Sequence, residues 1–131
     1  INITPTPYVI MVVPTGWGSS THSTGNETID VLSLLPAANK YDGIPPRGYW
    51  VTLRAADSGS AGAACSISLR KNSAAPSYSG AYINLEGTPN GDYRQVSRYV
   101  PCETDGSLYI EMVATGSDTL TINLEITAIQ R

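Results

Sequence analysis

Apolar and polar residues alternate without interruption in the stretch Leu120-Thr121-Ile122-Asn123-Leu124-Glu125-Ile126-Thr127-Ala128. Successive side chains of a β-strand point to opposite faces, so this period of two gathers the apolar residues on one face and the polar residues on the other. The stretch therefore predicts a long strand with one face in a core and the other face toward solvent.

The same alternation recurs upstream, and each occurrence predicts a further strand. Runs of this kind, together with one continuous apolar run at 8–13, cover 8–13, 49–55, 65–70, 81–86, 93–100 and 108–112. The connection 114–118 is rich in turn formers, so the last two strands are predicted to pair as a terminal hairpin.

Turn-forming residues separate these runs, beginning with Pro14-Thr15-Gly16. One segment, 29–38, has a capping Thr28 and several leucines, but Pro36 would stop a helix early, so a strand or a single turn is expected there. The longest connection is predicted at 36–48.

Seven or eight short strands separated by regular turns predict an all-β fold. The expected architecture is an antiparallel two-sheet sandwich, either a jelly roll or Ig-like. A chain of 131 residues is long enough to bury its own core, and no linker or repeat divides it. Residues 1–131 are therefore predicted to form a single β-sandwich domain.

Composition argues against several partners. Eight Lys and Arg stand against eleven Asp and Glu, which gives a net charge of -3, so a nucleic-acid partner is not expected. No apolar stretch approaches the roughly 18–20 residues of a membrane span, so the chain is expected to be soluble with no membrane partner.

Cys65 and Cys102 are the two cysteines, and they lack the spacing or the histidine partners of a zinc or redox site. Both lie on or beside predicted strands. The sequence leaves open whether Cys65 and Cys102 form a disulfide or stay as buried free thiols.

Catalytic chemistry finds little support. His22 is the sole histidine and lies in a predicted loop, 18–25, while Glu86, Glu111 and Glu125 fall on outward strand faces. Aspartates in predicted loops are better explained as turn residues than as calcium ligands. We therefore expect no enzymatic activity, no catalytic residues, no metal site and no cofactor.

The aromatic content is eight Tyr, two Trp and no Phe. An aromatic side chain with a polar group can stack on a sugar while keeping a hydrogen bond to water. Trp17, Tyr41 and Tyr78 all fall in predicted loops, which makes them the candidate ligand-binding residues. The alternative is that these rings pack over a sandwich end or edge.

Three segments carry a resemblance to known proteins. The pattern 49–62, with Tyr49-Trp50-Val51-Thr52-Leu53-Arg54 before an Asp/Ser/Gly turn, is followed by Val100-Pro101-Cys102 with Asp105-Gly106 and by the terminal strand 119–126. This pattern resembles β-sandwich modules of bacteriophage virions, found in tail fibres and in capsid decoration or cement proteins. The resemblance implies a role in assembly or attachment at a virion surface, and it transfers no site residues.

Two functions follow as expectations. The first is a non-enzymatic virion-surface structural module, a capsid decoration or cement protein or a tail-fibre component, that docks on other virion or surface proteins and forms a homo-oligomer, with a trimer favoured. The second is a lectin-like attachment module that binds carbohydrate through Trp17, Tyr41 and Tyr78. Either function would place the protein on a virion surface or outside the cell.

Overall fold

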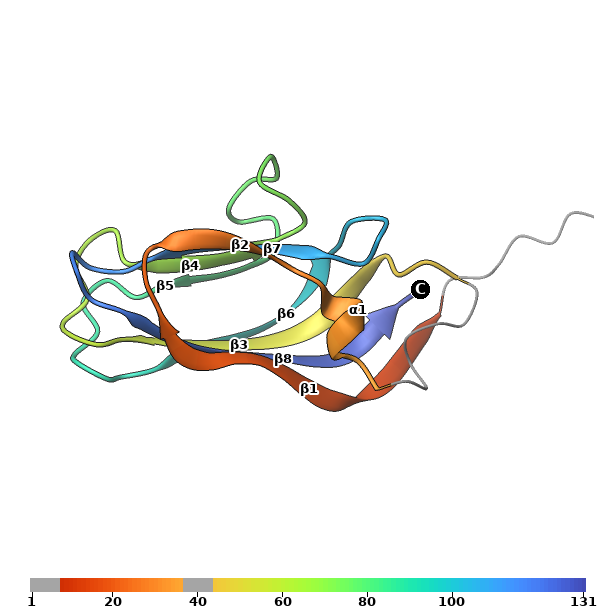
Figure 1. Cartoon of the computed structure of the whole chain (residues 1–131), viewed down its shortest axis with the longest axis horizontal. Coiled ribbons are helices and arrows are strands. Elements are labelled where there is room, and N and C mark those ends of the chain that lie inside the picture. Colours follow the sequence, from red (N-terminus) through yellow and green to blue (C-terminus); the bar gives the residue numbers. More distant parts are fainter. Residues whose placement is uncertain (1–7, 37–43) are drawn as a thin grey trace, which may run out of the picture.

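Eight β-strands form two four-stranded antiparallel sheets that lie face to face (Figure 1). The structure is a computed structural model that describes residues 8–36 and 44–131. The elements are β1 (Val9–His22), β2 (Gly25–Ile29), α1 (Val31–Leu34), β3 (Gly48–Asp57), β4 (Ser66–Arg70), β5 (Ala81–Asn84), β6 (Arg94–Pro101), β7 (Leu108–Val113) and β8 (Leu120–Gln130).

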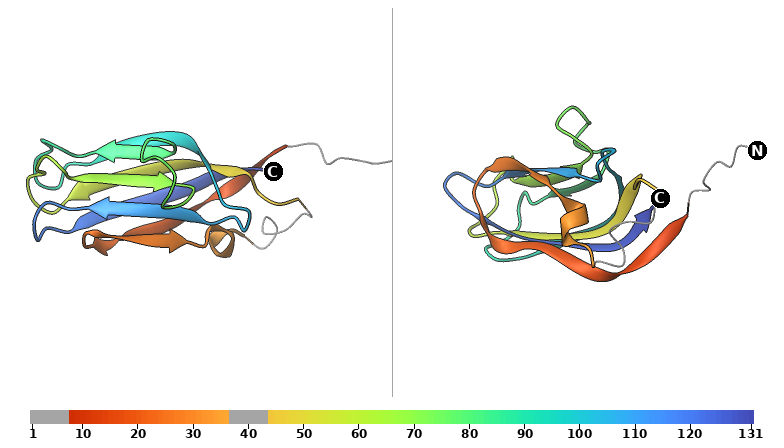
Figure 2. Two further views of the ribbon diagram at one scale, coloured as in Figure 1. Left: turned by 90° about the horizontal axis from the view of Figure 1, so that it is seen from above. Right: turned by 45° about the vertical axis from the view of Figure 1, so that its right-hand side comes forward.

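The strand order is β1-β8-β3-β6 in one sheet and β2-β7-β4-β5 in the other, and the second order can be followed across the left view of Figure 2. Strands pair as β1 with β8, β2 with β7, β3 with β6 and β4 with β5, all antiparallel. This is one long antiparallel ribbon, folded back at β4–β5 and rolled into two layers, which is the jelly roll. The predicted sandwich is confirmed.

Strand β8 lies inside its sheet and pairs with both β1 and β3. Its inward side chains Leu120, Ile122, Leu124 and Ile126 are at most 1% exposed. They belong to the same core as the inward residues of β7, among them Leu108 and Ile110, which are fully buried. The alternation therefore separates core from solvent as far as Ile126. A register shift in the pairing with β3 then places Ala128 opposite Trp50, so the predicted core-facing position of Ala128 is wrong, and Ile129 is the next residue in the core.

The predicted terminal hairpin is wrong. β7 pairs with β2 and β4, whereas β8 lies in the opposite sheet, so the 114–119 connection crosses from one layer to the other. Each of the two strands buries one face. Two such faces can pack against each other across the sandwich, so burial does not require the strands to be neighbours in one sheet. The alternation alone does not decide between these arrangements.

The predicted turn at Pro14-Thr15-Gly16 is also wrong, because β1 continues through it to His22. Two irregularities in the pairing with β8, between Met11 and Thr15 and between Gly18 and Thr21, absorb the residues that do not fit a regular ladder. Pro14 lies in the first of them. An edge strand tolerates proline at a bulge, where no ladder hydrogen bond is lost.

The segment after β2 contains the single turn α1, as one of the two interpretations of the sequence predicted. Thr15 Oγ1 donates a hydrogen bond of 2.8 Å to Leu34 O, which fixes α1 beside the middle of β1. No helix among the described residues is both long enough and apolar enough to cross a bilayer.

Tyr49 stabilises the end of the sandwich that lies near α1. It is fully buried, and its hydroxyl donates to Gly106 O at 2.6 Å, which joins β3 to the loop before β7. Burial raises the pKa of Tyr49 well above its usual range, so the hydroxyl stays protonated and keeps this hydrogen bond.

Alanine substitutions at Gly18 and Gly16 test the bulge in β1. Gly18 has φ +99, and a Cβ there would clash with Ile122 O, whereas a Cβ on Gly16 would meet only Leu124 O at 3.7 Å. We expect Gly18→Ala to lower the free energy of unfolding by about 2–4 kcal/mol and Gly16→Ala to change it by less than about 1 kcal/mol. Urea unfolding of the two variants measures this difference, and equal effects would contradict the bulge.

Candidate functional site

The three aromatic candidates do not form one site. Trp17 lies within β1, not in a loop, and packs partly against the core. Tyr78 lies in the β4–β5 connection, beside the other sheet, and is 68% exposed with its ring 4.5 Å from that of Tyr82. Tyr41 lies outside the described residues. The grouping of Trp17 with Tyr78 is therefore not seen in the structure.

His22 is the last residue of β1, whereas the sequence predicted a loop at this position. Its ring stacks on Trp17, with centroids 5.1 Å apart, and its Nε2 is buried with no hydrogen-bond partner among the described residues. The strand holds both rings at the edge where β1 turns toward β2. The stacking explains why the only histidine is partly buried.

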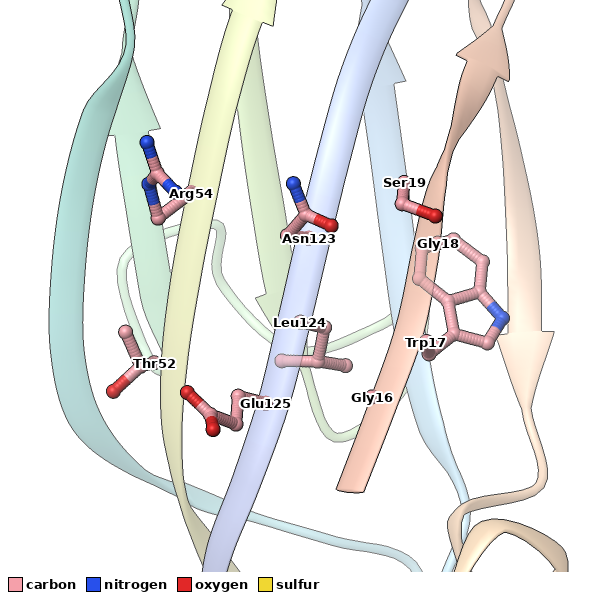
Figure 3. A pocket seen from close by; sticks show the side chains of 9 residues that line it. All are labelled: Gly16, Trp17, Gly18, Ser19, Thr52, Arg54, Asn123, Leu124 and Glu125. Atoms are coloured by element: carbon pink, nitrogen blue, oxygen red, sulfur yellow. The ribbon is translucent and has the colours of Figure 1, made fainter. Parts of the chain in front are cut away.

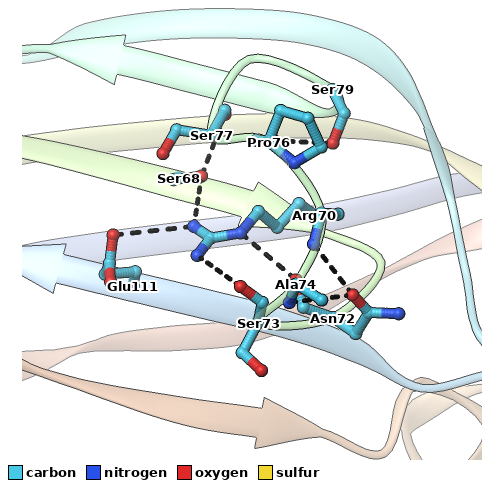
Figure 4. A network of polar contacts seen from close by, with 10 residues as sticks. Ser68, Arg70, Asn72, Ser73, Ala74, Pro76, Ser77, Ser79 and Glu111 are labelled. Carbon is cyan, nitrogen blue, oxygen red and sulfur yellow. Dashed lines mark hydrogen bonds and ion pairs between the residues drawn. The ribbon is translucent and has the colours of Figure 1, made fainter.

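The β4–β5 connection is held by a buried arginine (Figure 4). Arg70 donates to Ser68 Oγ at 2.9 Å and to Asn72 O at 3.2 Å, and its guanidinium lies 3.6 Å from Glu111. Ser68 Oγ donates in turn to Ser77 O. β4 is therefore buried on both faces, one by the core and one by its own loop.

The candidate site is a hollow of about 440 Å³ on the solvent-facing side of the β1-β8-β3-β6 sheet (Figure 3). We call it the polar trough. Its residues are Gly16, Trp17, Gly18 and Ser19 from β1, Thr52 and Arg54 from β3, and Asn123, Leu124 and Glu125 from β8.

Strand register explains why a trough forms at this place. Thr52 lies beside Glu125, and Arg54 lies beside Asn123, so two rows of polar side chains cross β3 and β8. On β1 the rows continue at Gly16, opposite Glu125, and at Gly18, opposite Asn123. Because both β1 positions lack side chains, the surface is hollow where a regular strand would fill it.

The polar groups of the trough are available to a ligand. Among the described residues, the side chains of Asn123 and Glu125 have no hydrogen-bond partner, and the Arg54 guanidinium contacts the ring of Tyr93 at 4.5 Å. Thr52 Oγ1 is paired with Ser97 Oγ at 2.9 Å. Amide, carboxylate and guanidinium therefore face a common space with unused donors and acceptors.

A smaller hollow of about 280 Å³ lies near the start of β7, on the other sheet. Two of its polar side chains are already paired, since Asn72 donates to Glu103 Oε1, and Asn72 also accepts from the backbone of Ala74 and Ala75. These bonds shape the loop that follows β4. This hollow is less suited to a ligand than the polar trough.

Asp57 stabilises the end of the sandwich that is opposite to Tyr49. Its carboxylate accepts hydrogen bonds from Gly59 N at 2.8 Å, Thr115 N at 3.1 Å and Cys65 Sγ at 3.2 Å. Burial by itself would raise the pKa of Asp57, but hydrogen bonds, the strongest from Asp118, outweigh it and lower this pKa to about 2. The same contact raises the pKa of Asp118. The Asp57 carboxylate therefore joins the β3–β4 connection to the β7–β8 connection, and its role is structural.

The two cysteines are free and buried, with separate partners. Cys65 donates to Asp57, while Cys102 Sγ lies 3.6 Å from Pro46 O. The structure thus corresponds to the free-thiol alternative and does not join Cys65 to Cys102. Burial raises the pKa of each thiol to about 11. No three His, Cys, Asp or Glu side chains of residues 8–36 and 44–131 converge as metal ligands do.

Sequence reasoning missed the polar trough. Glu125 was recognised as an outward carboxylate, but its neighbours Thr52 and Arg54 are some seventy positions away in the chain. Only the register between strands brings them together. The one local signal was the Gly-Trp-Gly sequence at 16–18, which was interpreted as part of a loop.

Comparison with known proteins gives limited information. No protein-family model and no curated protein matches the chain. Among solved structures, the coat protein of Tobacco streak virus aligns over 100% of this chain and 90% of its own, with 8% sequence identity and a TM-score of 0.44. That likeness is too weak to assign a family.

The pKa of Asp57 predicts a pH dependence of stability. A carboxyl whose pKa is lower in the folded chain stabilises the fold above its unfolded pKa of about 3.9, and this contribution disappears as the pH falls through about 2. We expect the wild type to lose on the order of 1–2 kcal/mol of unfolding free energy from this group between pH 4 and pH 2. The Asp57→Asn variant should have a lower free energy of unfolding at neutral pH, and this free energy should change less between pH 4 and pH 2 than that of the wild type.

Urea unfolding at a series of pH values measures these profiles. Asp92→Asn, which changes an exposed loop carboxylate, is the matched control and should keep the wild-type profile. An Asp57→Asn profile as steep as that of the wild type would contradict the assignment.

Thiol titration with an aromatic disulfide reagent tests the cysteines. With pKa values of about 11 and buried side chains, Cys65 and Cys102 should react very slowly at pH 8 in the native protein. In urea, both thiols should titrate without a reductant. Finding no thiol in urea would instead show a disulfide.

Proposed function

We propose that this chain is a single-domain, non-enzymatic structural module of a virion surface that works by docking its β1-β8-β3-β6 sheet on neighbouring proteins. The observation that carries the proposal is an apolar row across the outer face of that sheet. Met11 lies beside Ala128, Ala128 beside Trp50, and Trp50 beside Tyr99, so the row crosses all four strands. We call these four residues the apolar belt.

The apolar belt is accessible at its β1 end and partly accessible on β3 and β6. Met11 is 75% exposed, Ala128 is buried, and Trp50 and Tyr99 are half-buried, with their rings in contact at 4.8 Å in a tilted arrangement. The Tyr99 ring also lies over Gly48, where a Cβ would be 2.5 Å from it. Accessible Met and aromatic side chains in one patch are typical of protein interfaces.

Charge supports docking on this face. β1 contains no Lys, Arg, Asp or Glu, whereas the opposite edge strand of the same sheet, β6, carries Arg94 and Arg98. Charged residues on an edge strand oppose pairing with another chain, and an uncharged edge does not. The side of the sheet formed by β1 is therefore the better suited to a neighbour.

The virion location and the trimer rest on the resemblance to phage β-sandwich modules and on the habit of such modules to act as symmetric oligomers. Capsid decoration, cement and tail-fibre roles all use this kind of docking. The lectin-like alternative, with loops at Trp17, Tyr41 and Tyr78, is less well supported, because Trp17 and Tyr78 belong to different sheets.

Sedimentation velocity over a wide dilution series tests the docking. We expect the wild type to persist as an oligomer, with a trimer favoured, and Met11→Glu and Trp50→Ala to weaken association by about tenfold or more, since each removes an apolar contact worth about 1.5–3 kcal/mol. Tyr78→Glu, which also places a carboxylate at an exposed apolar residue but on the other sheet, is the matched control and should associate as the wild type does.

The location has a separate test. Mass spectrometry of purified virus particles should find the chain in stoichiometric copy number. A wild type that is monomeric at every concentration and is absent from particles would overturn the proposed function.

A further inference from the structure

The geometry points to a second role for the outer face of the same sheet: the polar trough binds a neutral saccharide. This site lies beside the apolar belt, since Thr52 is two residues beyond Trp50 on β3. Of the predicted glycan-binding residues that the structure describes, Trp17 is part of the trough and Tyr78 is not. The inference does not depend on the proposed docking function.

Size and shape fit a small polar ligand. The trough encloses about 440 Å³, which is within the range of roughly 300–1,000 Å³ found for small-molecule sites. Strands lie about 4.8 Å apart, so the distance from β1 across β8 to β3 is about 10 Å. The floor is rigid, because it is made by three hydrogen-bonded strands.

The donors and acceptors fit hydroxyl groups. Asn123 presents two donors and an acceptor, Glu125 presents acceptors, and Arg54 presents donors. Neighbouring hydroxyls of a sugar both donate and accept, so they can satisfy all three side chains at once. In the smaller hollow, by contrast, the amide of Asn72 and the carboxylate of Glu103 are paired with each other.

The charge of the trough favours a neutral ligand. Arg54 and Glu125 contribute one charge of each sign, and Asn123 and Thr52 contribute none. An anionic sugar placed within reach of Arg54 would also meet Glu125, and like charges in contact are unfavourable. A neutral hexose or N-acetylhexosamine meets no such repulsion.

An aromatic ring borders the trough beyond β3. Tyr93, which is 43% exposed, lies against Arg54, whereas Trp17 lies opposite Leu124 and packs against the core. The apolar C–H face of a sugar packs on such a ring while its hydroxyls face polar groups. The trough thus offers both kinds of contact that a saccharide needs.

The backbone of β1 is strained where it borders the trough. Ser19 has φ 75, and it is the only non-glycine among the described residues with a positive φ; it follows Gly18 at φ 99. Such strain at a non-glycine residue is unfavourable and concentrates at functional sites. Bulges of this type redirect side chains beside binding sites, and here the bulge keeps the trough open.

The test is binding of maltotriose, lactose and chitotriose to the whole chain, by calorimetry and by tryptophan fluorescence. We expect at least one of these neutral sugars to bind at micromolar to millimolar concentration. Asn123→Ala and Glu125→Gln should each weaken that binding by about fivefold or more, as expected when one ligand hydrogen bond is lost.

Gly16→Val is the decisive variant, because a Cβ at this position has room, 3.7 Å from Leu124 O, and the side chain would extend into the trough. We expect it to abolish binding. Gly25→Val, on β2, also has room for its Cβ and should bind as the wild type does. Matching unfolding curves for the two variants show that both are folded.

Two outcomes would overturn the inference. The first is no binding of any of the three sugars. The second is binding that Gly16→Val leaves unchanged, and a change of oligomeric state in that variant would then assign the trough to the protein interface. Met11→Glu separates the two proposals, since it should disturb association and leave sugar binding within about twofold of the wild type.

Discussion

The backbone of β8 is hydrogen-bonded to β1 on one side and to β3 on the other, so its alternating sequence sets the inner and outer faces of the whole sheet. A shift of one residue in either pairing would turn inward residues outward and would expose the core. The fully buried Ile122 and Ile126 oppose such a shift. With the register fixed, both outer-face features follow: the apolar belt at Ala128, and the polar trough at Asn123 and Glu125.

Local pattern predicted the strands well and their partners poorly. The period-two runs at β3, β4, β5, β6, β7 and β8 are each present near their expected bounds, because one buried face suffices to produce the pattern. The partner of each strand depends on contacts distant in sequence. β7 and β8 are neighbours in the chain and lie in opposite sheets, and β1 crosses a proline that local reasoning interprets as a turn.

The candidate site could not be predicted from the sequence for the same reason. The sequence draws attention to Trp17 between its two glycines. In the structure, the effect of those glycines is to leave space beside Asn123 and Glu125. Such a hollow is a property of register. The role of Asp57 is not visible in the sequence either. Asp is a common turn residue, and only the structure shows that this carboxylate joins the β3–β4 and β7–β8 connections.

The place of β8 between β1 and β3 also has a consequence for biosynthesis. During synthesis β1 and β3 leave the ribosome before β8. Until β8 emerges, the strand that lies between β1 and β3 in the sheet is missing. The β4–β5 hairpin can close early, but the sheet that carries both outer-face features is completed by the last described strand. The apolar run of β1 therefore stays without a partner strand through most of synthesis, and a fold built mainly from such non-local contacts is expected to form slowly.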